Sequence, residues 1–274
     1  MTVDTRLVTT SIEVGSPGRK IAIKTRASRG DCNSKHAYGL FWLGGFLSDM
    51  EGTKALHVDD YAARSWLQCT RFDYSGHGIS GGDFLEGTIS RWREEAEAVL
   101  SITSGPQILI GSSMGAWIAM LMAVRAMKHN MKHISNKIAG MVLIAPAVDF
   151  TERILWPSLS QENKDELMRA GRFNLRFQGS DDDCVITQSL IEDGRLNLLM
   201  DGSIELGCPV YILQGVGDLE VPWRHAVLLL EHISCVDITL SLVQDGDHRL
   251  SRPSDLERLD KTIDAALCAA IRQE

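Results

Sequence analysis

The stretch "ILIGSSMGAWIAM", from Ile108 to Met120, decides the fold of this chain. Its first half is a short apolar run typical of a buried strand, and its second half repeats apolar residues at helical spacing. Gly111 and Gly115 flank two serines between these halves, which gives the pattern Gly-x-Ser-x-Gly centred on Ser113. A serine on a tight strand-to-helix turn leaves no room for flanking side chains, and glycines meet that need. We therefore predict that Ser113 is an exposed nucleophile; the alternative is that the serines only cap the helix.

Outward from this stretch, buried apolar runs alternate with helical segments. Strands are predicted over residues 6–14, 19–25, 38–46, 69–78, 108–110, 139–148, 208–218 and 236–248. Helices are predicted over residues 52–66, 88–103 (with Thr88 as N-cap), 116–127, 224–233 and 254–271. This alternation predicts an α/β fold, with a mostly parallel eight-stranded sheet covered by helices on both faces. The first two strands would form an antiparallel edge.

The alternation breaks between residues 149 and 206, where short helices and glycine-rich loops are predicted. We expect a core domain of residues 1–148 and 207–274, with residues 149–206 inserted as a small helical lid over the carboxyl ends of the strands. Leu155, Trp156 and Leu159 are candidate lid residues for an apolar substrate pocket. The alternative is that they pack the lid onto the core.

A serine hydroxyl needs a base, and in this type of fold the base follows the nucleophile with an acid between them. "QGVGDLEVP" places Asp218 directly after one buried strand, and "DGDHRLS" places His248 after the next. The predicted acid is Asp218 and the predicted base is His248. His77, within "DYSGHGISGG", is the competing histidine, and it is more consistent with a turn at the pocket rim. Other carboxylates considered for the acid are Asp149, Glu220, Asp245 and Asp247.

An oxyanion hole should be formed by backbone N–H groups at the start of the helix and after an early strand. Met114 begins the helix after Ser113, and "WLGGFLSDM" supplies Phe46 after two glycines. The N–H groups of Phe46 and Met114 are therefore the predicted oxyanion donors. Asp73, in "RFDYSGHG", comes too early to be the acid and is interpreted as a brace for its loop.

Composition narrows the function classes. The chain has 274 residues and a formal net charge of −8, which argues against nucleic-acid binding. No apolar run is long enough to span a membrane, and no metal-ligand spacing or nucleotide-binding loop is found, so no cofactor is expected. Six widely spaced cysteines are expected to be reduced and mostly buried: Cys32, Cys69, Cys184, Cys208, Cys235 and Cys268. The polar N-terminus is not a signal peptide, so a cytoplasmic enzyme is expected, with its oligomeric state left open.

The motifs "GSSMGAW", "RFDYSGHGISGG", "GGFLSDMEGTKA", "QGVGDLEVPW" and "DGDHRLS" together resemble the α/β-hydrolase superfamily. Within it they are most similar to the acyl-protein thioesterase and acyl-glucuronide esterase branch of abhydrolase domain-containing protein ten. The resemblance implies Ser113, Asp218 and His248 as a catalytic triad that hydrolyses esters or thioesters, including fatty-acyl thioesters of protein cysteines. Alternatives are a small-ester carboxylesterase, a peptidase or an acyltransferase on the same fold, and a catalytically silent ligand-binding protein.

Overall fold

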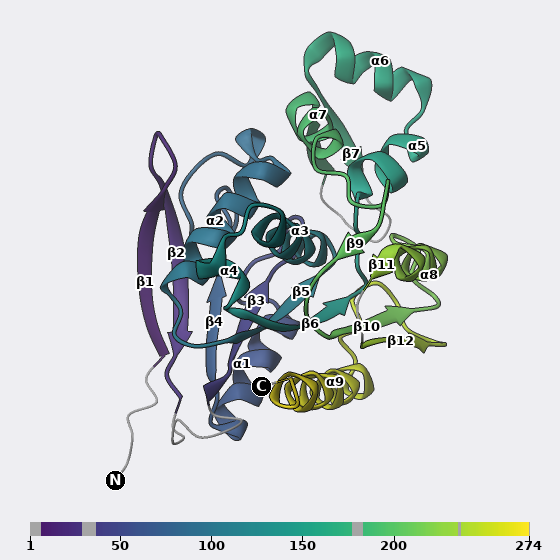
Figure 1. Cartoon of the computed structure of the whole chain (residues 1–274). Helices are drawn as coiled ribbons and strands as arrows, with labels where there is room; N and C mark the ends of the chain where they lie inside the picture. The colour runs from purple at the N-terminus through teal and green to yellow at the C-terminus, as the bar shows by residue number, and fades with distance from the viewer. Residues whose placement is uncertain (1–6, 29–36, 177–182, 235–236, 274) are drawn as a thin grey trace.

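An eight-stranded sheet forms the centre of the chain in a computed structural model that describes residues 7–28, 37–176, 183–234 and 237–273 (Figure 1). Its strands are β1 (Leu7–Val14), β2 (Arg19–Arg26), β3 (Gly39–Leu43), β4 (Gln68–Phe72), β5 (Gln107–Ser112), β6 (Ile138–Ile144), β10 (Val210–Gly215) and β12 (Ile238–Val243). They lie in the order β1-β2-β4-β3-β5-β6-β10-β12. The pairs from β4 to β12 are parallel, whereas β1 and β2 are antiparallel to their neighbours. The predicted α/β architecture and its antiparallel edge are confirmed.

Helices cover both faces of this sheet. They are α1 (Thr53–Ser65), α2 (Ile89–Ile102), α3 (Met114–Lys128), α4 (Lys132–Ser135), α8 (Trp223–His232) and α9 (Pro253–Ile271). A short 3₁₀ turn, η2 (Phe84–Glu86), precedes α2. The predicted N-cap of α2 is confirmed, because Thr88 Oγ1 accepts a hydrogen bond of 3.2 Å from the Arg91 N–H.

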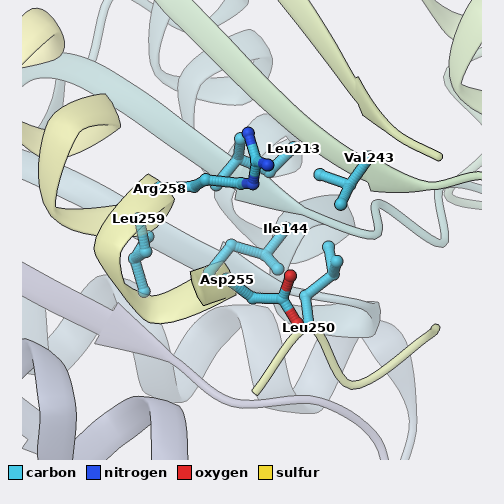
Figure 2. Close-up of a pocket in the computed structure, with 7 residues that line it drawn as sticks. All are labelled: Ile144, Leu213, Val243, Leu250, Asp255, Arg258 and Leu259. Carbon is cyan, nitrogen blue, oxygen red and sulfur yellow. The ribbon is translucent and has the colours of Figure 1, made fainter. Parts of the chain in front are cut away.

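The hydrophobic core has two parts, one on each face of the sheet. One part packs α2, α3 and α8 against the sheet, and the other packs α1 and α9 against the opposite face. The central strands β3, β5 and β10 are buried along their whole length because both of their faces are covered. A cavity of about 10 Å³ between α9 and the sheet has room for about one water molecule, and thus none for a substrate (Figure 2).

Residues 149–206 contain strands as well as helices. This segment has a π-helical turn η3 (Thr151–Leu155), then α5 (Trp156–Ser158), α6 (Gln161–Ala170), β7 (Arg172–Arg176), β8 (Asp183–Thr187), α7 (Gln188–Arg195) and β9 (Ile204–Glu205). Strands β7 and β8 pair antiparallel, and β9 pairs with β11 (Ile233–Ser234). Figure 1 shows α5, α6, α7 and β7 grouped beyond the main sheet.

The prediction of short helices joined by loops is therefore corrected for this hairpin. Its strands do carry a period-2 signal, because Phe173 is buried on β7, as are Cys184 and Ile186 on β8. The thiols of Cys69, Cys184 and Cys208 are buried and that of Cys268 is exposed. The predictions for Cys32 and Cys235 fall outside the described residues.

Candidate active site

The turn between β5 and α3 holds Ser113 in a strained backbone conformation. Its φ and ψ are 53° and −116°. A non-glycine residue in this conformation destabilises the fold by about 1–3 kcal/mol and keeps it only where the surrounding structure holds the backbone in place. The Ser113 N–H donates to the Ile144 carbonyl at 2.9 Å, and the Ser113 carbonyl accepts from Ala116 and Ala147 at 3.1 and 3.2 Å. These hydrogen bonds to α3 and to β6 and the loop after it offset the strain.

The two glycines of the motif are required by close backbone contacts. A Cβ atom at Gly111 would lie 2.7 Å from the Cα of Ala116, in the first turn of α3. A Cβ atom at Gly115 would overlap the carbonyl oxygens of Leu43 and Gly44, at the end of β3. Because Gly111 and Gly115 have no side chains, β5 can lie against the first turn of α3, and the end of β3 can lie against the same turn.

The structure brings Ser113, His248 and Asp218 together in one hydrogen-bonded chain. His248 Nε2 lies 3.1 Å from Ser113 Oγ, and His248 Nδ1 lies 2.8 Å from Asp218 Oδ2. An ionised Asp218 requires the proton on Nδ1, which leaves Nε2 free to accept from the serine hydroxyl. The three residues follow β5, β12 and β10, so the carboxyl ends of parallel strands bring them to one edge of the sheet.

The carboxylate of Asp218 is fully buried and held by its own loop. Its Oδ1 accepts from the N–H groups of Glu220 and Val221 at 2.9 and 2.8 Å. Its Oδ2 accepts from Gln214 Nε2 at 3.1 Å as well as from His248. Gln214 is not among the residues predicted from the sequence, although it is a polar residue within the otherwise apolar strand "VYILQG".

The loop after β3 passes beside Ser113, as the oxyanion prediction requires. A Cβ atom built on Gly45 would lie 3.3 Å from Ser113 Cβ and 4.0 Å from its Oγ. Phe46 follows Gly45 directly, and its ring packs against Phe84, Trp92 and Phe150 at centroid distances of 5.2, 6.0 and 5.8 Å. Met114 is the first residue of α3, whose N-terminus carries a partial positive charge suited to an oxyanion.

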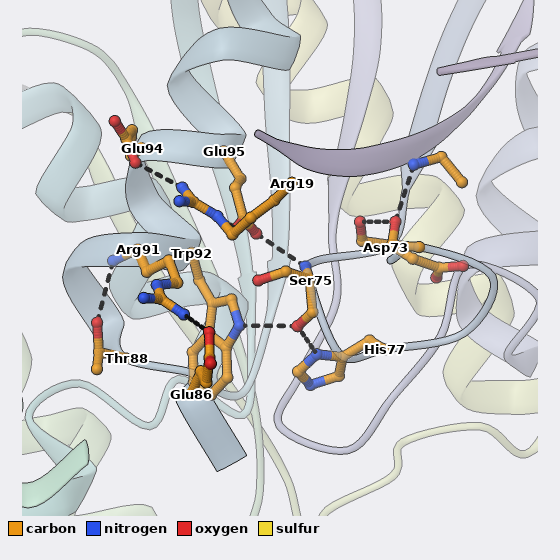
Figure 3. A network of polar contacts seen from close by, with 12 residues as sticks. Arg19, Asp73, Ser75, His77, Glu86, Thr88, Arg91, Trp92, Glu94 and Glu95 are labelled. Atoms are coloured by element: carbon orange, nitrogen blue, oxygen red, sulfur yellow. Dashed lines mark hydrogen bonds and ion pairs between the residues drawn. The ribbon is translucent and has the colours of Figure 1, made fainter. Parts of the chain in front are cut away.

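His77 bonds to the loop after β3 and not to Ser113. Its Nε2 accepts from the Leu47 N–H at 3.3 Å, and its Nδ1 donates to the Ser75 carbonyl at 3.2 Å. The same carbonyl accepts from Trp92 Nε1, and the Ser75 N–H donates to Glu95 (Figure 3). Burial lowers the pKa of His77, which keeps the ring neutral and its Nε2 available as an acceptor.

Asp73 and Asp149, the other buried carboxylates considered above, also bond to backbone amides. Asp73 accepts from Met50 and Ile79, so it joins the loop after β3 to the loop after β4. Asp149 accepts from Leu199 N–H at 2.9 Å and from the following amide at 2.8 Å, which ties together the two ends of the 149–206 segment. Burial raises the pKa of both carboxyls.

Two further carboxylate candidates and the three lid candidates have partners of their own. Asp247 Oδ1 accepts from the Leu250 N–H at 2.8 Å, and Asp245 pairs with Arg252. Leu155 and Leu159 are 4% and 5% exposed within the core. Trp156 is flanked by Arg195 and Lys164, at 4.6 and 5.2 Å from its ring centroid. These lid side chains pack against protein, and a role in substrate binding stays a prediction.

In the described part of the chain, no group of three or more histidine, cysteine, aspartate or glutamate side chains is placed to hold a metal ion. No helix there has both the length and the apolar character needed to cross a bilayer.

Comparison with known proteins decides the family. The model of the alpha/beta hydrolase family matches residues 36–256. The chain belongs to this family. Among curated proteins, the hydrolase is similar to human and mouse "Palmitoyl-protein thioesterase ABHD10, mitochondrial", at 30% and 31% identity. The human and mouse matches each cover 82% of this chain, and they cover 72% and 74% of those proteins.

Solved structures give the same family. A putative hydrolase from Agrobacterium vitis S4 is 46% identical to this hydrolase, with a TM-score of 0.88 over 96% of this chain and 99% of that chain. Mouse alpha/beta hydrolase domain-containing protein 10 is 28% identical, with a TM-score of 0.79 over 94% of this chain and 97% of that chain. The resemblance inferred from the sequence motifs is confirmed.

The prediction of a cytoplasmic enzyme is wrong by this comparison. The curated relatives from human, orangutan, cattle, mouse and rat are all named mitochondrial, which contradicts the prediction. The prediction relied on the amino-acid composition and on the polarity of the first residues. Neither property determines the cellular compartment of a folded protein.

Proposed function

We propose that this hydrolase cleaves carboxylic esters and thioesters through an acyl-enzyme on Ser113, with His248 as base and Asp218 as acid. The observation that carries the proposal is the chain of hydrogen bonds from Asp218 through His248 to Ser113, at 2.8 and 3.1 Å. Nucleophile, base and orienting acid are thus within reach of one another before substrate binds.

The proposed reaction has two steps. In the first, His248 Nε2 takes the Ser113 proton while Oγ attacks the acyl carbonyl carbon, and Asp218 stabilises the imidazolium that forms. His248 then protonates the departing thiol or alcohol. In the second step, the same nitrogen removes a proton from water as the water oxygen attacks the acyl carbonyl carbon. His248 then returns this proton to Ser113 Oγ as the bond to the acyl group breaks and the carboxylic acid leaves. Neither step calls for a cofactor.

The proposed oxyanion hole consists of the N–H groups of Phe46 and Met114. The proximity of Gly45 to Ser113 supports the first donor, and the position of Met114 at the start of α3 supports the second. Removal of one such donor typically lowers kcat by about 10²–10³-fold.

An apolar acyl group is the proposed substrate feature. The aromatic rings of Phe46, Phe84 and Phe150 pack beside the loop after β3, and Phe46 and Phe84 are partly exposed. Residues 149–206 are the proposed lid, attached at both ends through Asp149. The thioesterase names of the relatives support thioesters, including acylated protein cysteines, as the substrate class.

The test is labelling by a fluorophosphonate probe together with hydrolysis of p-nitrophenyl esters and acyl thioesters of increasing chain length. We expect Ser113→Ala to abolish labelling and to lower kcat by a factor on the order of 10⁴–10⁶. Ser112→Ala is the matched control, since it removes the neighbouring hydroxyl and should remain labelled. Full activity in Ser113→Ala, or a folded wild type that takes no label, would refute the proposal.

A further inference from the structure

A second carboxylate faces the nitrogen of His248 that bonds Ser113. Glu220 Oε2 lies 3.7 Å from His248 Nε2, while Asp218 contacts Nδ1 on the other side of the ring. The Glu220 side chain is 39% exposed, so it borders the solvent side of the site. The proposed reaction assigns this carboxylate no step.

The loop that carries Asp218 fixes the position of Glu220. The Glu220 N–H donates to Asp218 Oδ1 at 2.9 Å, and the next amide, that of Val221, donates to the same oxygen at 2.8 Å. Val221 is 3% exposed and belongs to the core. The backbone of Glu220 is therefore attached to the acid itself, so its carboxylate remains close to His248.

The cation Lys54 interacts with the Glu220 carboxylate through its charge, and Asp218 and Asp247 share that interaction. Lys54 Nζ donates to the Arg249 carbonyl. Burial lowers the pKa of Lys54 to about 8. Arg249 is exposed, and Asp247 is turned toward the Leu250 amide. Of these groups, Glu220 is the one with a recorded ion-pair contact to Nε2.

The leaving group has to approach this same nitrogen. Its sulfur or oxygen must come within about 3 Å of Nε2 to accept the proton. A charge two or three bonds farther along the leaving group then lies roughly 6–8 Å from the Glu220 carboxylate. At an effective dielectric constant between those of a protein surface and water, one unit charge at that range changes the rate constant by about fivefold to tenfold.

We propose that Glu220 selects substrates by the charge of the leaving group. It favours esters and thioesters whose leaving group is cationic or neutral, such as a cysteine in a basic peptide segment. It disfavours leaving groups that carry a carboxylate, sulfonate or phosphate. This inference rests on the proposed function, because it concerns proton delivery from His248 to the group that departs.

The test uses three thioesters of one acyl chain that differ only in the leaving thiol: thiocholine, 2-mercaptoethanol and 2-mercaptoethanesulfonate. In wild type we expect kcat/KM to fall from the cationic to the anionic thiol, by about 25-fold or more across two charge units. Glu220→Gln should reduce this ratio to less than about fivefold, and Glu220→Lys should reverse the order. Raising the ionic strength from 0.01 to 0.5 M should shrink the wild-type ratio, because screening then acts within a few ångströms.

Glu257→Gln is the matched control, since it removes the same charge from an exposed position on α9 and should leave the ratio as in wild type. An unchanged ratio in both Glu220 variants would overturn the inference. If that result came while Ser113→Ala remained inactive, the proposed function would stand. If wild type hydrolysed none of the three thioesters and took no fluorophosphonate, the proposed function would fail instead.

Discussion

Replacement of His77 by phenylalanine tests whether this histidine positions the loop after β3, which carries the proposed oxyanion donor Phe46. The substitution keeps a ring of similar size among Tyr74, Phe84 and Trp92, whose centroids lie 5.8, 5.2 and 5.2 Å away. It removes the acceptor for the Leu47 N–H and the donor to the Ser75 carbonyl. The packing is thus preserved while both polar links are lost.

The expected magnitude follows from those two hydrogen bonds. Without this acceptor, the Leu47 N–H loses its hydrogen-bond partner at a partly buried position. The loss should destabilise the observed conformation of the loop after β3 by about 1–2 kcal/mol. Such a cost lowers the population of the aligned loop, and hence kcat, by about 5- to 30-fold. KM should change by less than about twofold, since Leu47 acts through the neighbouring oxyanion donor.

The assay measures kcat and KM on one p-nitrophenyl ester together with the affinity for a trifluoromethyl ketone of the same acyl chain. Because the ketone should form a tetrahedral adduct with Ser113 that uses the proposed oxyanion hole, its affinity should fall by the same factor as kcat. His57→Phe, on α1, is the matched control and should preserve both. A kcat within twofold of wild type, or a loss of kcat with unchanged ketone affinity, would refute the reasoning.

Three further predictions concern stability. Gly115→Ala should destabilise the fold by more than about 3 kcal/mol in urea unfolding and abolish labelling, because its Cβ would overlap a β3 carbonyl. Gly202→Ala, with open space around it, should do neither. Asp149→Asn should lower the free energy of unfolding by about 1–3 kcal/mol and speed proteolysis within residues 149–206, since an NH2 group replaces one of the two oxygens that accept from the Leu199 and Met200 amides. Equal cleavage rates in the variant and the wild type would contradict this. Burial lowers the pKa of His225, so the unfolded state binds more protons below about pH 6.5 and stability is lost as pH falls toward the folded pKa. The fall in Tm from pH 7.5 to 5.5 should therefore be smaller in His225→Gln, and an equal fall would rule this out.

The order of strands and helices could be predicted from the sequence because each depends on local periodicity. The strand "ILIGS" and the apolar side of α3 are both visible within one short window. The hairpin of β7 and β8 could not be predicted, because each strand has only five residues, β7 is mostly polar, and only a few alternate positions are buried. Over five residues, the hydrophobic pattern of a short amphipathic strand differs little from that of a short helix.

The candidate site divides in a similar way. Gly111, Ser113 and Gly115 could be selected from the sequence because the steric demand of the turn is local to five residues. Asp218 and His248 could be selected from their places after buried strands. The link between His77 and Leu47 could not be predicted, because it joins two loops whose separation depends on how β3 and β4 are packed.

By itself, the sequence determined the strand-to-helix turn at Ser113, the succession of buried strands and the chain order of the proposed nucleophile, acid and base. Backbone sterics and side-chain periodicity act over a few residues, so both can be inferred from the sequence alone. Only the tertiary structure decided that Glu220 faces Nε2 of His248, that His77 supports the loop after β3 and that Asp149 joins the two ends of its segment. Those contacts join segments remote in the chain, and their distances are set by sheet register and core packing, which no local pattern specifies.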